Sequence, residues 1–131
     1  MTKRKKFSAI LSNGIMPPME VALFHSRAKL KKRLAERGHE IELLKGFPGQ
    51  TFSLWEDGTL IHFVLVENIE DIEIYDQLAL LAHEGTHIAS HYFESIGEEE
   101  PAEEEWAYAV QAACAALFDM HLAWREGRSK Q

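Results

Sequence analysis

The residues that most directly suggest chemistry are His83, Glu84 and His87, which form the pattern H-E-x-x-H. Residues four apart lie on one face of a helix, so both imidazole rings can point at a single ion. Imidazole is a good zinc ligand, and zinc lowers the pKa of a coordinated water towards neutrality. Glu84 follows His83 directly, which places its carboxylate to accept a proton from that water. The pattern therefore predicts two zinc ligands and a base for hydrolysis.

A third zinc ligand is expected from a second helix further along the chain. On that helix Glu104, Tyr108 and Gln111 occupy positions i, i+4 and i+7, which gives a polar stripe on an otherwise apolar surface. We predict Glu104 as the third ligand, with Tyr108 and Gln111 as polar groups close to the metal. Two alternatives remain open: Glu103 or Glu105 supplies the ligand, or the stripe is solvated.

His91 and Glu94 are less suitable third ligands, although they follow the motif closely in the sequence. His91 lies eight residues after His83, which is about 12 Å along an unbroken helix and too far for one ion. The longer pattern H-E-x-x-H-x-x-G-x-x-H does not apply, because Ser90 and Phe93 stand at its glycine and final histidine. We therefore expect both to lie outside the metal site.

The motif lies in a long helical segment, which is expected to begin between Asp71 and Asp76, with either aspartate as its cap. It should end near Ile96, because Gly97 is a typical residue after a helix end. The apolar residues 78–82 precede the motif and indicate a buried helix. They predict that both motif histidines lie inside the protein.

The second helix is expected to follow Pro101 and to run to about Trp124. Glutamates 103–105 suit the positive N-terminal end of such a helix. Its core face is predicted from apolar residues at alternating spacings of four and three, namely Trp106, Val110, Ala113, Leu117 and Met120. Cys114, in the alanine-rich part of this segment, is expected to be a buried and inert thiol.

The first half of the chain is expected to supply the sheet. Residues 19–24 and 39–44 are predicted to be short strands. Asp57-Gly58 between the β-rich runs 51–55 and 60–66 predicts a hairpin. These strands followed by two long helices indicate an α+β domain spanning residues 1–131, with a small, mostly antiparallel sheet packed on the two helices.

A further helix is expected between the first two of these strands, with Ser26 as its N-cap and Gly38 at its end. Leu30 and Leu34 should form its buried face. Residues 1–18 are expected to be an arm or an irregular lead-in. The basic run 3–6 within them should be a solvated terminus.

Charge and composition restrict the partners. The net charge of -7 argues against general nucleic-acid affinity, which needs a basic face. No apolar run approaches the length of a membrane span. The single cysteine excludes an intrachain disulfide. We therefore expect an intracellular protein that binds neither nucleic acid nor membrane, and whose composition is compatible with an oligomer.

With these residues in place, the chain resembles the gluzincins, zinc metallopeptidases with H-E-x-x-H on one helix and a glutamate ligand on the next. Residues 104–108 are similar to the E-x-x-A form of their second motif. Residues 83–111 resemble small proteins of tailed bacteriophages and prophages. The resemblance implies a minimal zincin-like fold, in which an edge strand beside the site binds an extended peptide. From its order in the chain, Leu60–Val66 is the candidate for that strand.

The expected function is a zinc-dependent peptidase that hydrolyses peptide bonds in a peptide or protein substrate. His83, His87 and Glu104 hold the zinc, Glu84 activates water, and Tyr108 assists the oxyanion. An alternative is a phage virion or assembly component of the head, neck or tail, in which zinc is structural and the partners are phage structural proteins. A third is a metal-free regulatory or inhibitory protein. The resemblance places the protein in the bacterial host cytoplasm or in the virion.

Overall fold

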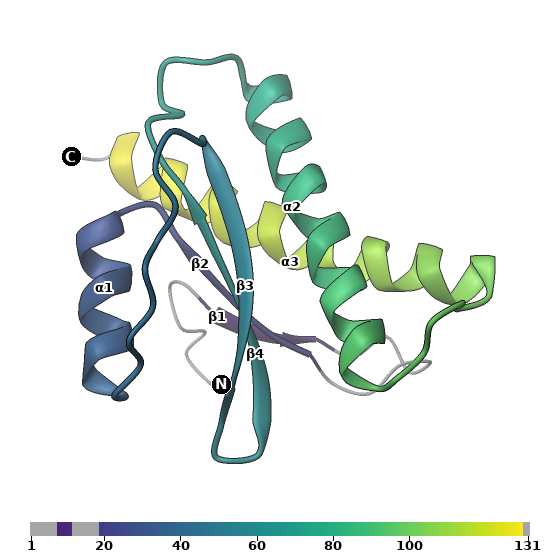
Figure 1. The fold of residues 1–131 in the computed structure, drawn as a ribbon. Helices are drawn as coiled ribbons and strands as arrows, with labels where there is room; N and C mark the ends of the chain where they lie inside the picture. Colours follow the sequence, from purple (N-terminus) through teal and green to yellow (C-terminus); the bar gives the residue numbers. More distant parts are fainter. Residues whose placement is uncertain (1–7, 12–18, 130–131) are drawn as a thin grey trace, which may run out of the picture.

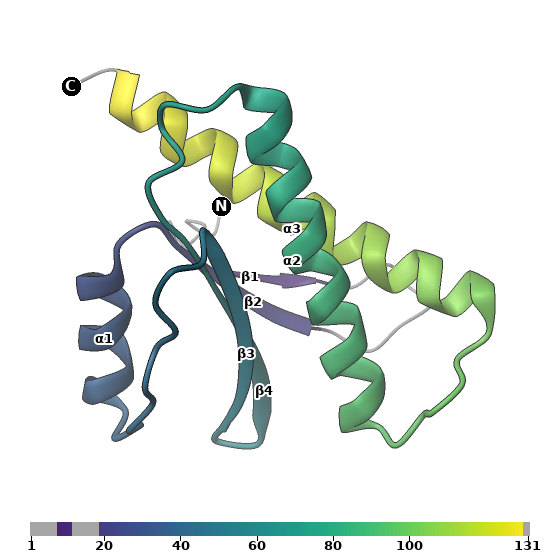
Figure 2. The same cartoon turned by 45° about the horizontal axis from the view of Figure 1, so that its top comes forward.

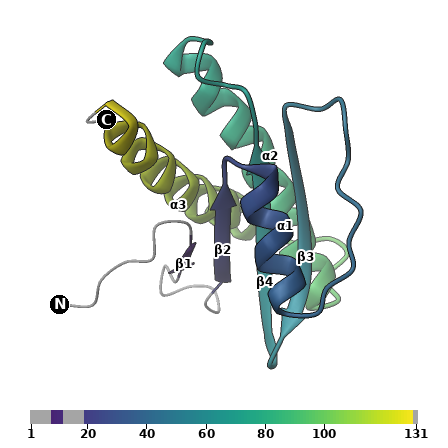
Figure 3. The ribbon, with the colours of Figure 1, turned by 90° about the vertical axis from the view of Figure 1, so that its left-hand side faces the viewer.

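The structure, a computed structural model, describes residues 8–11 and 19–129. α1 covers one face of a sheet, and α2 and α3 cover the other face (Figures 1 and 3). This arrangement confirms the predicted α+β class. The elements are β1 (Ser8–Leu11), β2 (Met19–Phe24), α1 (Arg27–Glu36), β3 (Gly49–Glu56), β4 (Thr59–Val66), α2 (Ile74–Ser95) and α3 (Glu103–Ser129).

The four strands form one mixed sheet in the order β1-β2-β4-β3. β1 pairs with β2 and β3 pairs with β4 in antiparallel fashion, whereas β2 and β4 are parallel. A parallel pair needs a long crossover, and α1 lies in the connection between β2 and the hairpin. The pairing of Ser8–Leu11 shows that an irregular lead-in is wrong for these four residues. The basic run 3–6 and the remainder of the expected arm lie outside the described residues.

The predicted hairpin is confirmed, but the predicted edge strand is wrong. Asp57 and Gly58 have φ values of 49° and 80°, the positive values that a tight two-residue hairpin turn requires. β4 lies between β2 and β3, so it is an internal strand, and β3 ends the described sheet order. The reason is burial: residues 61–66 are six consecutive buried positions, and an internal strand covered by helices on both faces has this pattern.

The predicted strand over residues 39–44 is also wrong, because this segment runs without regular structure before β3. The side chain of Gln50 takes the place of a strand partner. Its Oε1 accepts a hydrogen bond from the Leu44 N–H at 2.9 Å, and its Nε2 donates to the Leu44 carbonyl at 3.0 Å. The prediction for α1 is confirmed: Ser26 Oγ accepts from the Lys29 N–H, and Gly38 follows the helix with φ 75°.

Both predicted long helices are present, but their ends differ from the predicted ones. Glu73 is the N-cap residue of α2 and makes no side-chain capping bond, so neither Asp71 nor Asp76 caps this helix as predicted. Gly97, with φ 73°, follows its end as expected. α3 begins at Glu103 and continues past the predicted end at Trp124. None of the described helices is both long and apolar enough to cross a bilayer.

Two apolar clusters hold the layers together, one on each face of the sheet. Leu30 and Leu34 of α1 pack on one face, as predicted. On the other face, α2 and α3 pack on β2 and β4 (Figure 2). The predicted core face of α3 is confirmed, because Ala113, Leu117 and Met120 are buried, and Trp106 and Val110 pack against the same cluster.

A chain of buried polar side chains connects β2, α2 and α3. His121 is fully buried, and its Nε2 lies 2.7 Å from Gln77 Oε1, which can only accept. The Nδ1 atom of His121 must therefore accept from His25 Nε2, at 2.9 Å. Arg125 also donates to Gln77 Oε1, at 2.9 Å. This network fixes the neutral tautomer of His121 and makes His25 a donor through Nε2.

These histidines should make the fold sensitive to acid. Burial is the main cause that lowers the pKa of His121 to about 4 and of His25 to about 3. In the unfolded chain these histidines bind protons from about pH 6.5 downwards, whereas in the folded chain they do not. The free energy of unfolding should therefore be highest above that pH and decrease below it. We expect a loss of about 1–2 kcal/mol per buried histidine at pH 5. Urea unfolding of the wild type and His121→Gln at pH 7.5 and 5 tests this.

The His121→Gln variant should show the weaker pH dependence, since glutamine cannot take up a proton in this range. An equal dependence in both proteins would contradict a contribution from this ring.

Candidate metal site

The two motif histidines lie on the exposed side of α2, contrary to the prediction that they are buried. Their Nε2 atoms are 3.3 Å apart, and their ring centroids are 5.0 Å apart. The sequence correctly placed both rings on one face of the helix. It did not show which face packs: Leu81, Gly85 and Ile88 are among the buried positions of α2, while His83 and His87 face outwards.

Glu84 is the buried member of the motif, with 2% of its surface exposed. Its Oε1 accepts a hydrogen bond from Thr51 Oγ1 of β3 at 2.7 Å. Gly49, two residues earlier on the strand, leaves the space that the carboxylate occupies, since a Cβ there would come within 2.9 Å of Oε2. β3 therefore positions the carboxylate through the Thr51 hydroxyl, which donates a hydrogen bond, and through Gly49, which leaves room for it.

A cluster of three polar side chains, which the sequence did not predict, also joins α2 to the sheet. Ser53 Oγ lies 2.7 Å from Nδ1 of His62 and 3.1 Å from Nδ1 of His91. Burial lowers the pKa of His62 to about 4. The pKa of His91 is also lowered, mainly by burial and to a smaller extent by the nearby His87. The signal was present in β4, where His62 interrupts an apolar strand and faces Ser53 across the predicted hairpin, but the contact with His91 depends on how α2 packs on the sheet.

The polar stripe on α3 does not meet the histidine pair. Glu104, Tyr108 and Gln111 are all exposed, which supports the solvated alternative for the stripe. α2 comes close to α3 at Gly85, where a Cβ would lie 2.9 Å from the Cys114 sulfur. Glu104 is ten residues before Cys114, about 15 Å along the helix. No contact of the structure joins Glu104 to the histidine pair, so Glu104 can be a zinc ligand only if α3 approaches the histidines on metal binding.

Glu103 and Glu105, the alternative third ligands, are also exposed in the first turn of α3. Cys114 is partly buried rather than fully buried, and burial raises the pKa of its thiol, which favours the unreactive form.

The histidine pair fits zinc in one respect and is incomplete in another. Two Zn–N bonds of about 2.0–2.1 Å at a tetrahedral angle place their nitrogens about 3.3–3.4 Å apart, and the observed Nε2 separation is 3.3 Å. However, no group of three or more histidine, cysteine, aspartate or glutamate side chains in residues 8–11 and 19–129 is arranged to hold a metal ion. The described residues thus supply two ligands, with the remaining coordination positions open to solvent.

Comparisons with known proteins do not identify a family. No family model, no curated protein and no solved structure matches the chain.

The bond between Thr51 and Glu84 should be important for stability. Thr51→Val removes the donor to a buried carboxylate and should lower the free energy of unfolding by about 1–3 kcal/mol. Thr86→Val is the matched control, since Thr86 is exposed and donates only to the carbonyl of its own helix turn. We expect a change within about 0.5 kcal/mol for the control. Equal effects in urea unfolding would show that the bond to Glu84 contributes nothing specific.

Proposed function

We propose that the chain is a zinc-dependent peptidase in which His83 and His87 bind the metal and Glu84 is the general base. The observation that carries this proposal is the 3.3 Å separation of the two Nε2 atoms on an exposed helix face. At this separation one Nε2–H donates a hydrogen bond to the other ring, and a zinc ion that replaced this proton would be held by both nitrogens. When bound, zinc acts as a Lewis acid and makes a coordinated water acidic enough to lose a proton near neutral pH.

Glu84 supports this proposal because its two carboxylate oxygens have different surroundings. Oε1 is held by the Thr51 hydroxyl, and Oε2 lies against Gly49. The bond to Oε1 fixes the orientation of the carboxylate. In this proposal Oε2 accepts the proton, which requires the metal-bound water to reach this atom beside Gly49. The protein surroundings exclude bulk water from the carboxylate, which strengthens its electrostatic interactions.

β3 supports a peptide substrate. It is the last strand of the described sheet, so its outer edge pairs with no described strand. An extended peptide can add to such an edge through backbone hydrogen bonds. The strand also carries Thr51 beside Glu84, which would bring a peptide paired with β3 close to the base. In this respect β3 takes the role that the sequence assigned to residues 60–66.

A purely structural zinc, as in the alternative of a phage virion or assembly component, receives less support. Structural zinc sites are closed by four protein ligands, whereas catalytic sites keep a position open for water. The exposed pair leaves coordination positions open, and the described residues do not close the site. A catalytic zinc needs three protein ligands and a structural zinc needs four, so two exposed histidines are further from a structural site than from a catalytic one.

The proposal predicts that metal binding and cleavage can be separated by mutation. Glu84→Gln should retain about one zinc per chain, while cleavage of a library of unstructured peptides decreases by about 10²–10⁴-fold. His87→Ala should lose zinc, because one ligand is removed. Glu94→Gln, an exposed glutamate on the same helix, is the control and should retain both properties. Zinc content is measured by elemental analysis and cleavage by mass spectrometry.

Two outcomes would refute the peptidase proposal. One is cleavage that survives Glu84→Gln, and the other is a zinc-loaded wild type that cuts no peptide of the library.

The third ligand can be tested directly on α3. Because Glu104 is about 15 Å along the helix from the contact with α2, we expect Glu104→Gln to bind zinc within about threefold of the wild type. Glu103→Gln and Glu105→Gln are the matched controls. Zinc affinity is measured by competition with a chromogenic chelator. A large loss in Glu104→Gln alone would instead identify Glu104 as the third ligand and require α3 to approach the histidines on metal binding.

A further inference from the structure

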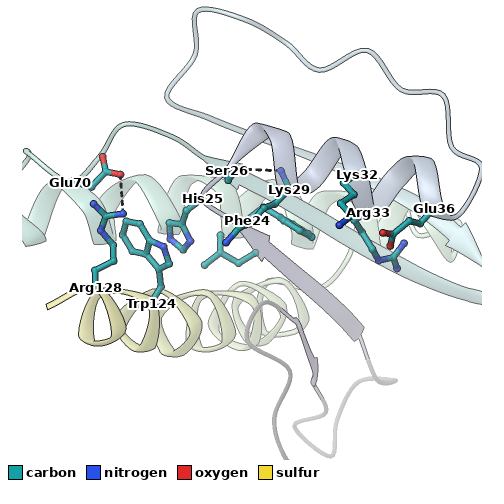
Figure 4. A pocket seen from close by; sticks show the side chains of 11 residues that line it. Phe24, His25, Ser26, Lys29, Lys32, Arg33, Glu36, Glu70, Trp124 and Arg128 are labelled. Atoms are coloured by element: carbon teal, nitrogen blue, oxygen red, sulfur yellow. Dashed lines mark hydrogen bonds and ion pairs between the residues drawn. The ribbon is translucent and has the colours of Figure 1, made fainter. Parts of the chain in front are cut away.

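A pocket of about 550 Å³ lies away from the motif, between α1 along its length and the last turns of α3 (Figure 4). Its lining comes from the end of β2, from α1, from α3 and from Glu70 in the loop before α2. The buried side chains of Leu23 and Phe24 contribute an apolar part of the lining. The volume is in the range of pockets that hold small organic ligands. This pocket therefore has the dimensions of a ligand site that is separate from the metal site.

The charge of this pocket is opposite to the charge of the protein. Four cationic side chains and two carboxylates line it, and a third carboxylate, Glu56, pairs with one of the cations from outside the lining, which leaves an excess of one positive charge. The whole chain carries a net charge of -7. The cations are Lys29, Lys32, Arg33 and Arg128, and the carboxylates are Glu36 and Glu70. Such a local reversal of sign favours an anionic ligand.

The two arginines of the pocket have ion-pair or ring partners, whereas the two lysines have no ion-pair partner among the described residues. Arg33 forms a two-point ion pair with Glu56, at 2.7 and 3.0 Å. Arg128 lies over the Trp124 ring at 4.8 Å, with Glu70 at 3.9 Å. Lys29 and Lys32 make no ion pair with the part of the chain that the structure describes, and they stand one helix turn apart on α1. Their ammonium groups are thus available to a ligand.

Trp124 is fixed at the other side of the pocket. Its ring stacks on His25, with centroids 3.7 Å apart and planes 1° apart, and Arg128 lies over the same ring. Figure 4 shows Trp124 between these two side chains and opposite the lysines of α1. Since His25 and Arg128 cover the faces of the indole, its edge, together with the Leu23 and Phe24 side chains, is left for a compact apolar group to contact.

We propose that this pocket binds a small phosphate monoester, with its phosphate at Lys29 and Lys32 and its organic part against Trp124. A phosphate monoester carries a charge of about -1.5 to -2 at neutral pH, which matches the excess of positive charge in the pocket. Lysine binds phosphate as a point charge, without the fixed geometry that arginine requires. The available lysines therefore favour a phosphate over a planar carboxylate.

The test uses phenyl phosphate as the probe and the full chain as the protein. Titration at constant ionic strength, followed by 15N–1H NMR, should show saturable shifts of the Trp124 indole and of α1 amides, with a Kd of about 1 mM or tighter. Phenol, which lacks the phosphate, should bind at least about tenfold more weakly. The absence of saturation up to about 10 mM, or saturable shifts located elsewhere, would overturn the proposal.

Matched lysine variants separate a specific site from general attraction. Lys29→Gln/Lys32→Gln should weaken phenyl phosphate binding by about tenfold or more. Lys31→Gln/Lys45→Gln removes the same charge from two exposed lysines outside the pocket lining, and should stay within about twofold. Equal weakening in both double variants would overturn the proposal. His87→Ala should bind the probe normally, so this test is independent of the metal site.

Discussion

The arrangement of the candidate site depends on one constraint, which is that α2 must fit two different neighbours at two adjacent residues. Gly85 meets α3 so closely that a Cβ would come within 2.9 Å of the Cys114 sulfur. Glu84, the preceding residue, points at β3 and is held by Thr51. Successive residues of a helix are about 100° apart, so these two contacts fix the rotation of α2. The two motif histidines are left on the open side.

This rotation divides the motif between a buried and an exposed environment. The carboxylate lies among protein groups, where its orientation is determined by the Thr51 hydroxyl and by the space at Gly49. The imidazole rings lie where a metal ion and its water can reach them from solvent. A hydrolytic metal centre needs an oriented base and an accessible metal, and the two must also meet at the metal-bound water. The neighbouring Ser53 adds further polar contacts between α2 and the sheet.

The opposite end of α3 shows a different use of buried polar groups. There His25, His121 and Gln77 form a continuous chain of hydrogen bonds, and no buried side-chain nitrogen or oxygen among the described residues lacks a partner. The network anchors the last turns of α3 to β2 and α2, and it supports Trp124 through the stacked His25 ring. The wall of the phosphate pocket is thus part of the same rigid assembly that closes the core.

The sequence by itself determined the features that depend on neighbouring residues. The cap at Ser26, the turn at Asp57-Gly58, the end of α2 before Gly97 and the common face of the histidine pair all follow from backbone geometry over a few positions. Only the tertiary structure decided which face of α2 is buried, which strand forms the edge, and how far α3 holds Glu104 from the histidines. These features depend on which elements pack together, and helix periodicity gives a face but not its neighbour.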